Sequence, residues 1–122
     1  VNVTSFNRHV LLTGEAPSEE VKQGVGQVVM GVPNVIDVTN EIAIGNVLPF
    51  SSRSNDTYIT SKVKGRMIDA NRFAPYHVKV ITENGVVYLM GLVTRKEAED
   101  AAEITRTTTD VRKVVKIFEY LD

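Results

Sequence analysis

Side chains that could carry out acid–base chemistry are few in this sequence, and they do not form a recognisable group. Histidine is the side chain that titrates near neutral pH, and the two histidines, His9 and His77, lie beside a predicted turn and just before a predicted strand. Carboxylates are more frequent, but they fall on the solvated faces of predicted helices: Glu19, Glu20, Glu97, Glu99, Asp100 and Glu103. Because no base, nucleophile and orienting group can be assembled from these residues, we predict that the protein is not an enzyme.

The sequence also argues against a metal ion or a cofactor. It contains no cysteine, which excludes disulfides, thiolate zinc ligands and a thiol nucleophile among these residues. Gly24, Gly26 and Gly31 have neither the spacing of a phosphate-binding loop nor a strand before them. We therefore expect no metal site and no cofactor-binding site.

A helix predicted over residues 55–71, capped by Asn55 or Asp56, has a face that suits contact with lipid. One stripe is apolar and should face a core: Ile59, Val63, Met67 and Ala70. The opposite side presents Tyr58, Gly65 and Ile68, and basic residues flank them: Lys62, Lys64 and Arg72. Apolar groups inside a basic rim can enter the headgroup region while the cations meet lipid phosphates. The alternative is a solvated basic face with Tyr58 packed on the preceding linker.

Such a helix would bind a membrane weakly by itself. A basic residue near an anionic surface contributes only about 1 kcal/mol. Stable residence at a membrane would therefore require a lipid anchor or a second contact.

The elements that position this helix are clearest in the second half of the chain. Residues 78–83 alternate with the period of a strand, Asn84-Gly85 is a strong signal for a tight hairpin turn, and residues 86–90 form the returning strand. Gly91 ends the hairpin, and Thr94 with Glu97 forms a capping box that opens a second helix. A third strand is predicted over residues 112–121.

Residues 1–44 repeat the pattern of residues 78–120, which indicates a duplicated module. Aligned without a gap, equivalent positions carry the same residue type: Val1, Val3, Asn7, Val10, Leu12 and Gly14 match Val78, Val80, Asn84, Val87, Leu89 and Gly91. After one residue is dropped in the following helix, Val35 and Val38 match Val111 and Val114. We predict an α+β fold with a first module at residues 1–45, a linker at 46–54 and a second module at 55–122. The helix at 55–71 has no counterpart, so an opening helix of the first module would precede Val1.

One sheet face of the second module is apolar on the side away from its predicted core. It carries Ile81, Tyr88, Met90, Val115 and Ile117, where the first module has Thr4, Leu11, Thr13, Thr39 and Glu41. A continuous apolar face usually marks a contact surface. We expect it to contact the other module or, alternatively, a protein ligand.

Composition is that of a globular protein with one ordinary domain or two very small ones. Of the 122 residues, 43% are hydrophobic, which is ample for a core. The 14 basic and 15 acidic residues nearly balance, which argues against a nucleic-acid-binding protein. No apolar run approaches the ~20 residues of a membrane-spanning helix.

The hairpin ending at Gly91, the helix from Arg95 and the pair Val111 and Val114 before the last strand resemble the BON domain. This envelope module has the order helix–strand–strand–helix–strand, with a three-stranded mixed sheet and helices on one face. Two copies, the second opening with residues 54–60, are similar to two-copy BON lipoproteins of Gram-negative outer membranes. The resemblance covers essentially the whole chain and is most specific at residues 54–59 and 82–92.

The resemblance implies a lipoprotein at the periplasmic face of the outer membrane, with its acylated cysteine upstream of Val1. It implies binding of anionic phospholipids such as phosphatidylglycerol and cardiolipin, a role in outer-membrane integrity, and localisation to the cell-division site. The membrane-entering aromatic residue corresponds to Tyr58, where relatives favour Trp, and Val63 and Ile68 follow along the helix. Gly65 departs from the usual polar residue. The lipid-binding residues that we predict are Asn55, Tyr58, Lys62, Val63, Lys64, Gly65, Ile68 and Arg72.

Two functional hypotheses follow from the sequence. The first is a non-enzymatic envelope protein that binds anionic phospholipid through the second module. The second is an adaptor for outer-membrane protein assembly that binds protein partners through the apolar sheet face.

Overall fold

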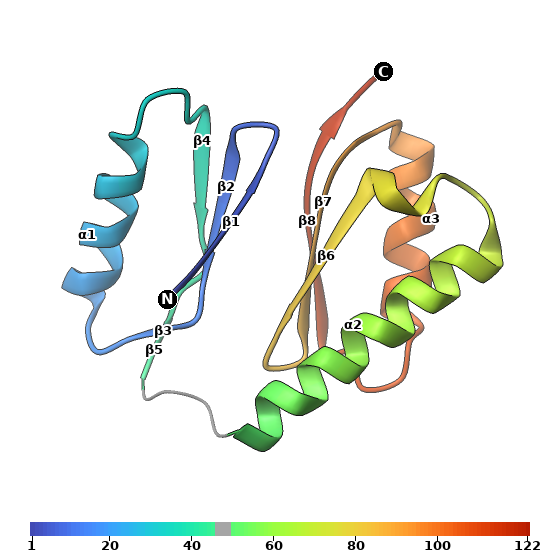
Figure 1. Ribbon diagram of the computed structural model, residues 1–122, viewed down its shortest axis with the longest axis horizontal. Coiled ribbons are helices and arrows are strands. Elements are labelled where there is room, and N and C mark those ends of the chain that lie inside the picture. Colours follow the sequence, from blue (N-terminus) through green and yellow to red (C-terminus); the bar gives the residue numbers. More distant parts are fainter. Residues whose placement is uncertain (46–49) are drawn as a thin grey trace. The chain divides into compact units, whose positions relative to one another are not determined.

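The computed structural model describes residues 1–45 and 50–122. It divides into two compact units, Val1–Leu48 and Pro49–Asp122, and each unit is described by itself (Figure 1). Within the described residues, no helix is long and apolar enough to cross a membrane.

The second unit contains two helices and three strands. In chain order they are α2 (Phe50–Ala70), a short 3-10 turn η1 (Pro75–His77), β6 (Val78–Glu83), β7 (Val86–Val93), α3 (Arg95–Arg106) and β8 (Lys113–Tyr120). The sheet has the order β6-β7-β8, with β6 antiparallel and β8 parallel to the central strand. Both helices cover the same face of this sheet (Figure 1). The predicted α+β module with a mixed three-stranded sheet is confirmed.

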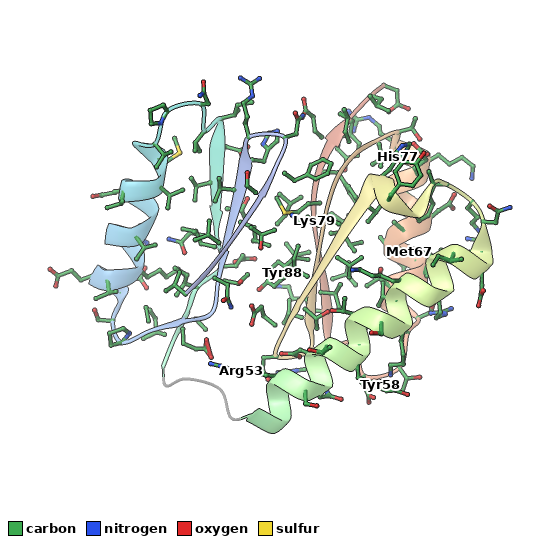
Figure 2. All side chains as sticks on the ribbon, in the orientation of Figure 1. Arg53, Tyr58, Met67, His77, Lys79 and Tyr88 are labelled. Carbon is green, nitrogen blue, oxygen red and sulfur yellow. The ribbon has the colours of Figure 1, made fainter. Side chains whose placement is uncertain are left out.

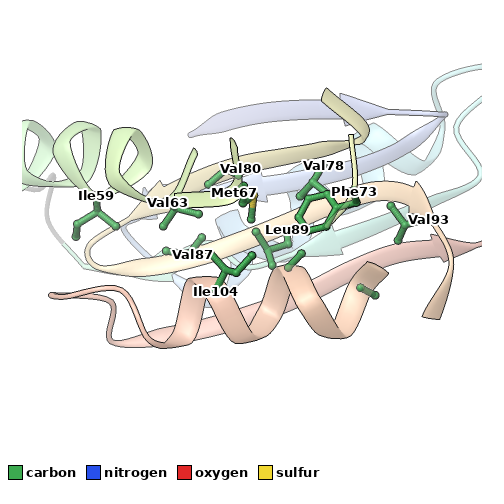
Figure 3. Close-up of a cluster of buried hydrophobic side chains, with 12 residues drawn as sticks. Ile59, Val63, Met67, Phe73, Val78, Val80, Val87, Leu89, Val93 and Ile104 are labelled. Carbon is green, nitrogen blue, oxygen red and sulfur yellow. The ribbon is translucent and has the colours of Figure 1, made fainter. Parts of the chain in front are cut away.

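The core of the second unit lies between its helices and its sheet (Figure 3). Both helices and the β6–β7 hairpin contribute fully or nearly fully buried apolar side chains: Ile59, Val63 and Met67 from α2, Val80, Val87 and Leu89 from the hairpin, and Ala98, Ala101 and Ile104 from α3. The alanines let α3 lie close to the sheet, because a small side chain keeps the two backbones near each other. The apolar stripe predicted for α2 is therefore the side that packs on the core.

The start of α3 follows the predicted capping box. The Thr94 side chain accepts a hydrogen bond from the backbone N–H of Glu97 at 3.1 Å, and the Glu97 carboxylate accepts one from the backbone N–H of Thr94 at 2.9 Å. These two bonds satisfy backbone donors that the first turn of a helix leaves without partners.

The first unit consists of β1 (Asn2–Phe6), β2 (His9–Thr13), β3 (Glu15–Ala16), α1 (Glu19–Met30), β4 (Asp37–Asn40) and β5 (Ala43–Ile44). Strands β1, β2 and β4 form a sheet with the same order and directions as β6-β7-β8. A short parallel pair, β3 with β5, adds to this plan and is absent from the sequence-based prediction. Four buried residues form the core: Val10, Leu12, Ala16 and Ile42.

The backbone confirms that the two units share one plan. Both hairpin turns have two residues with positive φ, at 48° and 67° for Asn7 and Arg8 and at 50° and 79° for Asn84 and Gly85. The loop that leads into β4 and the loop that leads into β8 each have one such residue at the same place, Asn34 at 74° and Asp110 at 73°. The duplication seen in the sequence therefore extends to the positions with positive φ angles, which most residues avoid.

The start of α2 differs from the prediction. The helix begins at Phe50, so Asn55 and Asp56 lie inside it and do not cap it. Residues 46–49 of the predicted linker lie outside the described residues, and residues 50–54 are helical. Asp56 has a different use, which is described with the candidate site.

Arg8 offers a test of the first turn. A left-handed backbone conformation costs an ordinary L-residue roughly 1–2 kcal/mol, and Arg8 holds a φ of 67° where the second unit has Gly85. Arg8→Gly is expected to raise the free energy of unfolding of the first unit by up to about 1 kcal/mol, since part of the gain is offset in the unfolded chain. Urea unfolding read from methyl signals of Val10 and Leu12 measures it. If Arg8→Ala, which retains the steric cost, stabilises the unit equally, the explanation is wrong.

Candidate lipid-facing surface of helix α2

Helix α2 has an exposed apolar pair on the side away from the core. Tyr58 is 60% exposed and Ile68 is 61% exposed. The helical period places Ser61 and Gly65 between them on the same stripe. A methyl group added at Gly65 would meet no atom within 4 Å, so the helix backbone is open there. In Figure 2, Tyr58 lies on the side of α2 that faces away from the sheet.

Val63 is the one predicted lipid-binding residue that this surface excludes. Its side chain is completely buried in the cluster between α2, the sheet and α3 (Figure 3). The helical period explains the correction, because Val63 shares the stripe of Ile59 and Met67 and is therefore on the core side. The other predicted residues of the set, Asn55 and Lys64 included, have side chains on the surface or partly on it.

Two of the predicted basic residues are held by protein groups. The Lys62 ammonium donates to the Thr109 carbonyl oxygen at 2.9 Å, lies 3.4 Å from an Asp110 carboxylate oxygen, and sits 4.7 Å from the centroid of the Tyr58 ring. The Arg72 guanidinium lies 3.7 Å from Asp100. The three N–H donors of the Lys62 ammonium thus face three protein partners, with which a further acceptor would have to compete.

Lys64 is the basic residue of the predicted set that is most available to a ligand. It is exposed, and within residues 1–45 and 50–122 its ammonium has no hydrogen-bond or ion-pair partner. Arg53, nearer the start of α2, is also exposed, and its guanidinium has no such partner within the described residues. Counting charges in the sequence could not separate these two cations from Lys62, because the partners of Lys62 are 47 and 48 residues away along the chain.

Arg66 has a role that the sequence did not reveal. One guanidinium nitrogen donates to the Ile104 carbonyl at 2.6 Å and to the hydroxyl oxygens of Thr108 at 2.7 Å and Thr107 at 3.0 Å. These acceptors belong to the last turn of α3 and the residues that follow it. A cation is favourable at the C-terminal end of a helix, so Arg66 and Lys62 together join the middle of α2 to the end of α3.

Asp56 fixes the other end of the surface. Its carboxylate accepts the backbone N–H of Asn84 at 2.7 Å on one oxygen and the N–H of Gly85 at 2.8 Å on the other. The side chain is only 6% exposed. A second bond, between the hydroxyls of Thr60 and Thr82 at 2.7 Å, joins the same helix to β6. Tyr58 therefore lies between two residues that hold α2 to the β6–β7 hairpin.

A shallow groove of about 340 Å³ lies beside the exposed stripe, between α2 and the end of α3. Apart from Gly65, the residues that line it are polar or charged: Lys62, Arg66, Asp69, Thr107, Thr108 and Thr109. Lys62 and Arg66 bring positive charge, and the absence of a side chain at Gly65 leaves the groove open. A phosphate with polar substituents fits this chemistry, because it needs cations for its oxygens and hydroxyl or carboxylate partners for its headgroup.

The apolar sheet face has the predicted register. Ile81 pairs with Tyr88, Tyr88 with Val115, and Met90 with Ile117, which places all five side chains on one face. None of them belongs to the core cluster between the helices and the sheet. Their proposed contact with the other unit or with a protein ligand stays a prediction.

Each histidine has a contact within its own unit. The His9 ring nitrogen Nδ1 lies 2.7 Å from an Asp37 carboxylate oxygen, which links β2 to β4. His77 belongs to η1, where its ring packs edge-on against Tyr76. Among the residues that the structure describes, no three His, Asp or Glu side chains are grouped so that they could hold a metal ion.

The fold and the duplication are those of a defined family. It matches the family model of the BON domain over residues 1–46 and 55–122, and it belongs to the BON-domain family.

Three curated relatives align with nearly the whole chain. It is 40% identical over 122 residues to outer membrane lipoprotein DolP of Haemophilus influenzae, covering 100% of the chain and 63% of that protein. It is 34% identical over 121 residues to the 21 kDa hemolysin of Actinobacillus pleuropneumoniae, covering 99% and 62%. Osmotically-inducible protein Y of Escherichia coli is 29% identical over 118 residues, covering 95% and 59%. The chain thus spans about three fifths of the length of these relatives.

Proposed function

We propose that this protein is a non-enzymatic envelope protein of the outer membrane that binds anionic phospholipid through α2 of its second BON domain. The observation that carries the proposal is the exposed pair Tyr58 and Ile68, which flanks Gly65 on one stripe of a helix with basic residues beside it. The name of the Haemophilus relative, an outer membrane lipoprotein, supports the location. We further propose attachment as a lipoprotein at the periplasmic face, with a role in membrane integrity and at the division site.

The mechanism is shallow insertion guided by charge. Tyr58 and Ile68 enter the boundary between headgroups and acyl chains, where a tyrosine ring keeps its hydroxyl in contact with water. Lys64 meets lipid phosphates directly, and Lys62 reaches a phosphate in competition with its contacts to Thr109 and Asp110. The side groove, with Arg66 and the threonines, receives a headgroup. Phosphatidylglycerol and cardiolipin suit it because they combine negative charge with glycerol hydroxyls.

The expected strength of this contact is modest. Full burial of one large apolar side chain contributes roughly 1.5–3 kcal/mol, and each basic residue near an anionic surface adds about 1 kcal/mol. Partial insertion of two side chains with one or two cations gives reversible binding. A covalent lipid anchor would then keep the domain near the bilayer and let α2 select the lipid.

Vesicle cosedimentation tests the proposal. Tyr58→Ala with Ile68→Ala is expected to lower the partition coefficient on phosphatidylglycerol vesicles by roughly tenfold or more, since each loses about 1 kcal/mol of apolar insertion. Lys64→Glu should reduce binding mainly at low salt, because exposed charges are screened. Tyr76→Ala is the matched control, since Tyr76 is a tyrosine that is 82% exposed in η1 and not on α2.

Two results would contradict the proposal. If the Tyr76 control loses as much vesicle binding as the Tyr58 and Ile68 variant, the lipid contact does not lie on α2. Failure of the unmodified chain to bind at low salt would exclude the lipid function of this surface. The second outcome would favour the adaptor for outer-membrane protein assembly, whose contact surface is the sheet face with Tyr88 and Met90.

A further inference from the structure

A second groove in the same unit lies where α3 meets the outer strand β8. Its volume is about 380 Å³, and it is lined by Ala102, Val111 and Val114 together with four basic residues, Arg106, Arg112, Lys113 and Lys116. The aliphatic side chains are buried or partly buried and form the floor, whereas all four basic residues are exposed. The proposed lipid site uses none of these residues.

The positive charge of this groove is only partly neutralised. Arg106 pairs with Glu103, and Lys116 lies 3.0 Å from Glu99. Arg112 donates to the Asn84 carbonyl oxygen at 3.2 Å, which leaves its charge unpaired. Lys113 has no partner within the described residues. Exposed ion pairs such as Arg106–Glu103 and Lys116–Glu99 contribute little to stability. A carboxylate of a ligand can therefore replace Glu103 or Glu99 as the partner of its cation.

The first unit provides an internal comparison, because it has a groove at the same place. That groove, of about 320 Å³, lies between α1 and β4 and contains Gly26, Met30, Val38 and Asn40. Helices α1 and α3 both have 12 residues, so Gly26 and Met30 occupy the positions of Ala102 and Arg106.

The strand registers extend the comparison to the rim. Val38 pairs with Val10 and Val114 pairs with Val87, so Asp37 and Asn40 occupy the positions of Lys113 and Lys116. The first unit therefore lines its groove with neutral residues and has an acidic residue, Asp37, at the position of Lys113. A groove of this kind therefore folds without a basic rim. We attribute the four basic residues of the second unit to a function other than folding.

The strand beside the groove has an unused edge. In the described residues, β8 pairs only with β7, and the sheet order β6-β7-β8 makes it an outer strand. Unpaired backbone groups along an outer strand can accept an additional strand from another chain. Basic side chains along such an edge repel a strand of like charge and attract an acidic one.

We propose that the α3–β8 groove binds an extended, acidic segment of a partner protein. The segment pairs its backbone with the outer edge of β8 over residues 113–117. Its carboxylates replace Glu99 and Glu103 as partners of Lys116 and Arg106 and meet Lys113. Its apolar side chains rest on the floor formed by Ala102, Val111 and Val114. This proposal does not depend on lipid binding by α2.

The probe for the test is a fluorescein-labelled hexapeptide of alternating glutamate and valine, titrated with the full chain and followed by fluorescence anisotropy. Arg106→Met with Lys116→Asn gives these positions the residues of the first unit and removes two positive charges. Affinity is expected to fall by roughly tenfold, because each exposed ion pair contributes up to about fivefold. Arg53→Met with Lys96→Asn makes the same residue changes at exposed positions outside the groove and should leave peptide affinity unchanged.

Three further measurements decide the outcome. A peptide with lysine in place of glutamate should not bind, and a peptide with alternate backbone N-methyl groups should bind at least several-fold more weakly because it cannot form a strand ladder. Backbone amide signals of residues 113–117 should shift on titration. Equal loss of affinity in the control variant, undiminished binding of the methylated peptide, or no binding of the acidic peptide would each overturn the proposal. Anionic vesicles that shift these amides while the peptide does not would assign the groove to lipid.

Discussion

Replacing Asp56 with alanine is expected to lower the free energy of unfolding of the second unit by roughly 2–4 kcal/mol, because two hydrogen bonds to a charged acceptor are lost and one of their donors stays buried. The donors are the backbone N–H groups of Asn84 and Gly85, at 2.7 and 2.8 Å from the two carboxylate oxygens. They belong to a turn whose positive φ angles already limit its alternatives. The alanine methyl group offers neither donor an acceptor.

The measurement is urea unfolding read from methyl signals of Val87 and Leu89. Asp56→Asn keeps one acceptor oxygen and should lose less stability than Asp56→Ala. Asp69→Ala is the control, since Asp69 is an exposed aspartate on the same helix, and it should change stability by no more than about 0.5 kcal/mol. A loss in Asp69→Ala as large as in Asp56→Ala would mean that the turn contact contributes little. Asp56→Ala should also bind vesicles less well, because Tyr58 is two residues from Asp56.

Gly91→Ala is expected to destabilise the second unit by about 1–3 kcal/mol, as overpacking does in tightly packed sites. A methyl group at this position would lie 2.3 Å from the His77 carbonyl oxygen. The obstacle is backbone of the adjacent strand end, so relief requires β6 and β7 to separate where Val78 pairs with Gly91. Gly91 is therefore required by close approach of two backbones.

Gly65→Ala is the matched control for this prediction. A methyl group at Gly65 meets nothing within 4 Å, and alanine favours a helix interior over glycine by about 1 kcal/mol. Thermal unfolding should therefore move in opposite directions for the two variants. If Gly91→Ala is as stable as the unmodified chain, the hairpin tolerates a shift that the structure does not show. If Gly65→Ala is destabilising, exposure of the helix backbone at this point has a stabilising role.

Most of the fold could be predicted from local sequence patterns. Asn84-Gly85 specifies its turn because both residues tolerate positive φ, and Thr94 with Glu97 specifies the start of α3 because both capping bonds are local. The apolar stripe of α2 follows from the helical period. The short pair β3–β5 could not be predicted, because two-residue strands have no period to detect.

The errors concern residues whose partners are distant in the sequence. Asp56 is a good N-cap by type, but its carboxylate binds a turn 28 and 29 residues further on, and the helix continues through it. The helical period assigns Val63 to the core side of α2, whereas the resemblance assigns it to the lipid side. In the structure its side chain is buried in the core. A count of charges treats Lys62 and Arg66 as part of a free basic surface, whereas both donate to the end of α3 and the loop after it. Composition gives the number of charges, and only tertiary structure gives their partners.

The position of Lys62 has a thermodynamic consequence. Its ammonium is shared among the Thr109 carbonyl, the Asp110 carboxylate and the Tyr58 ring. Any anion that draws this group outward weakens its hold on the loop after α3, and coupling between two such events is reciprocal. Tighter binding of Lys62 by residues 109–110 therefore lowers the affinity of Lys62 for an anion, and a substitution that strengthens this contact should weaken headgroup binding at Lys62.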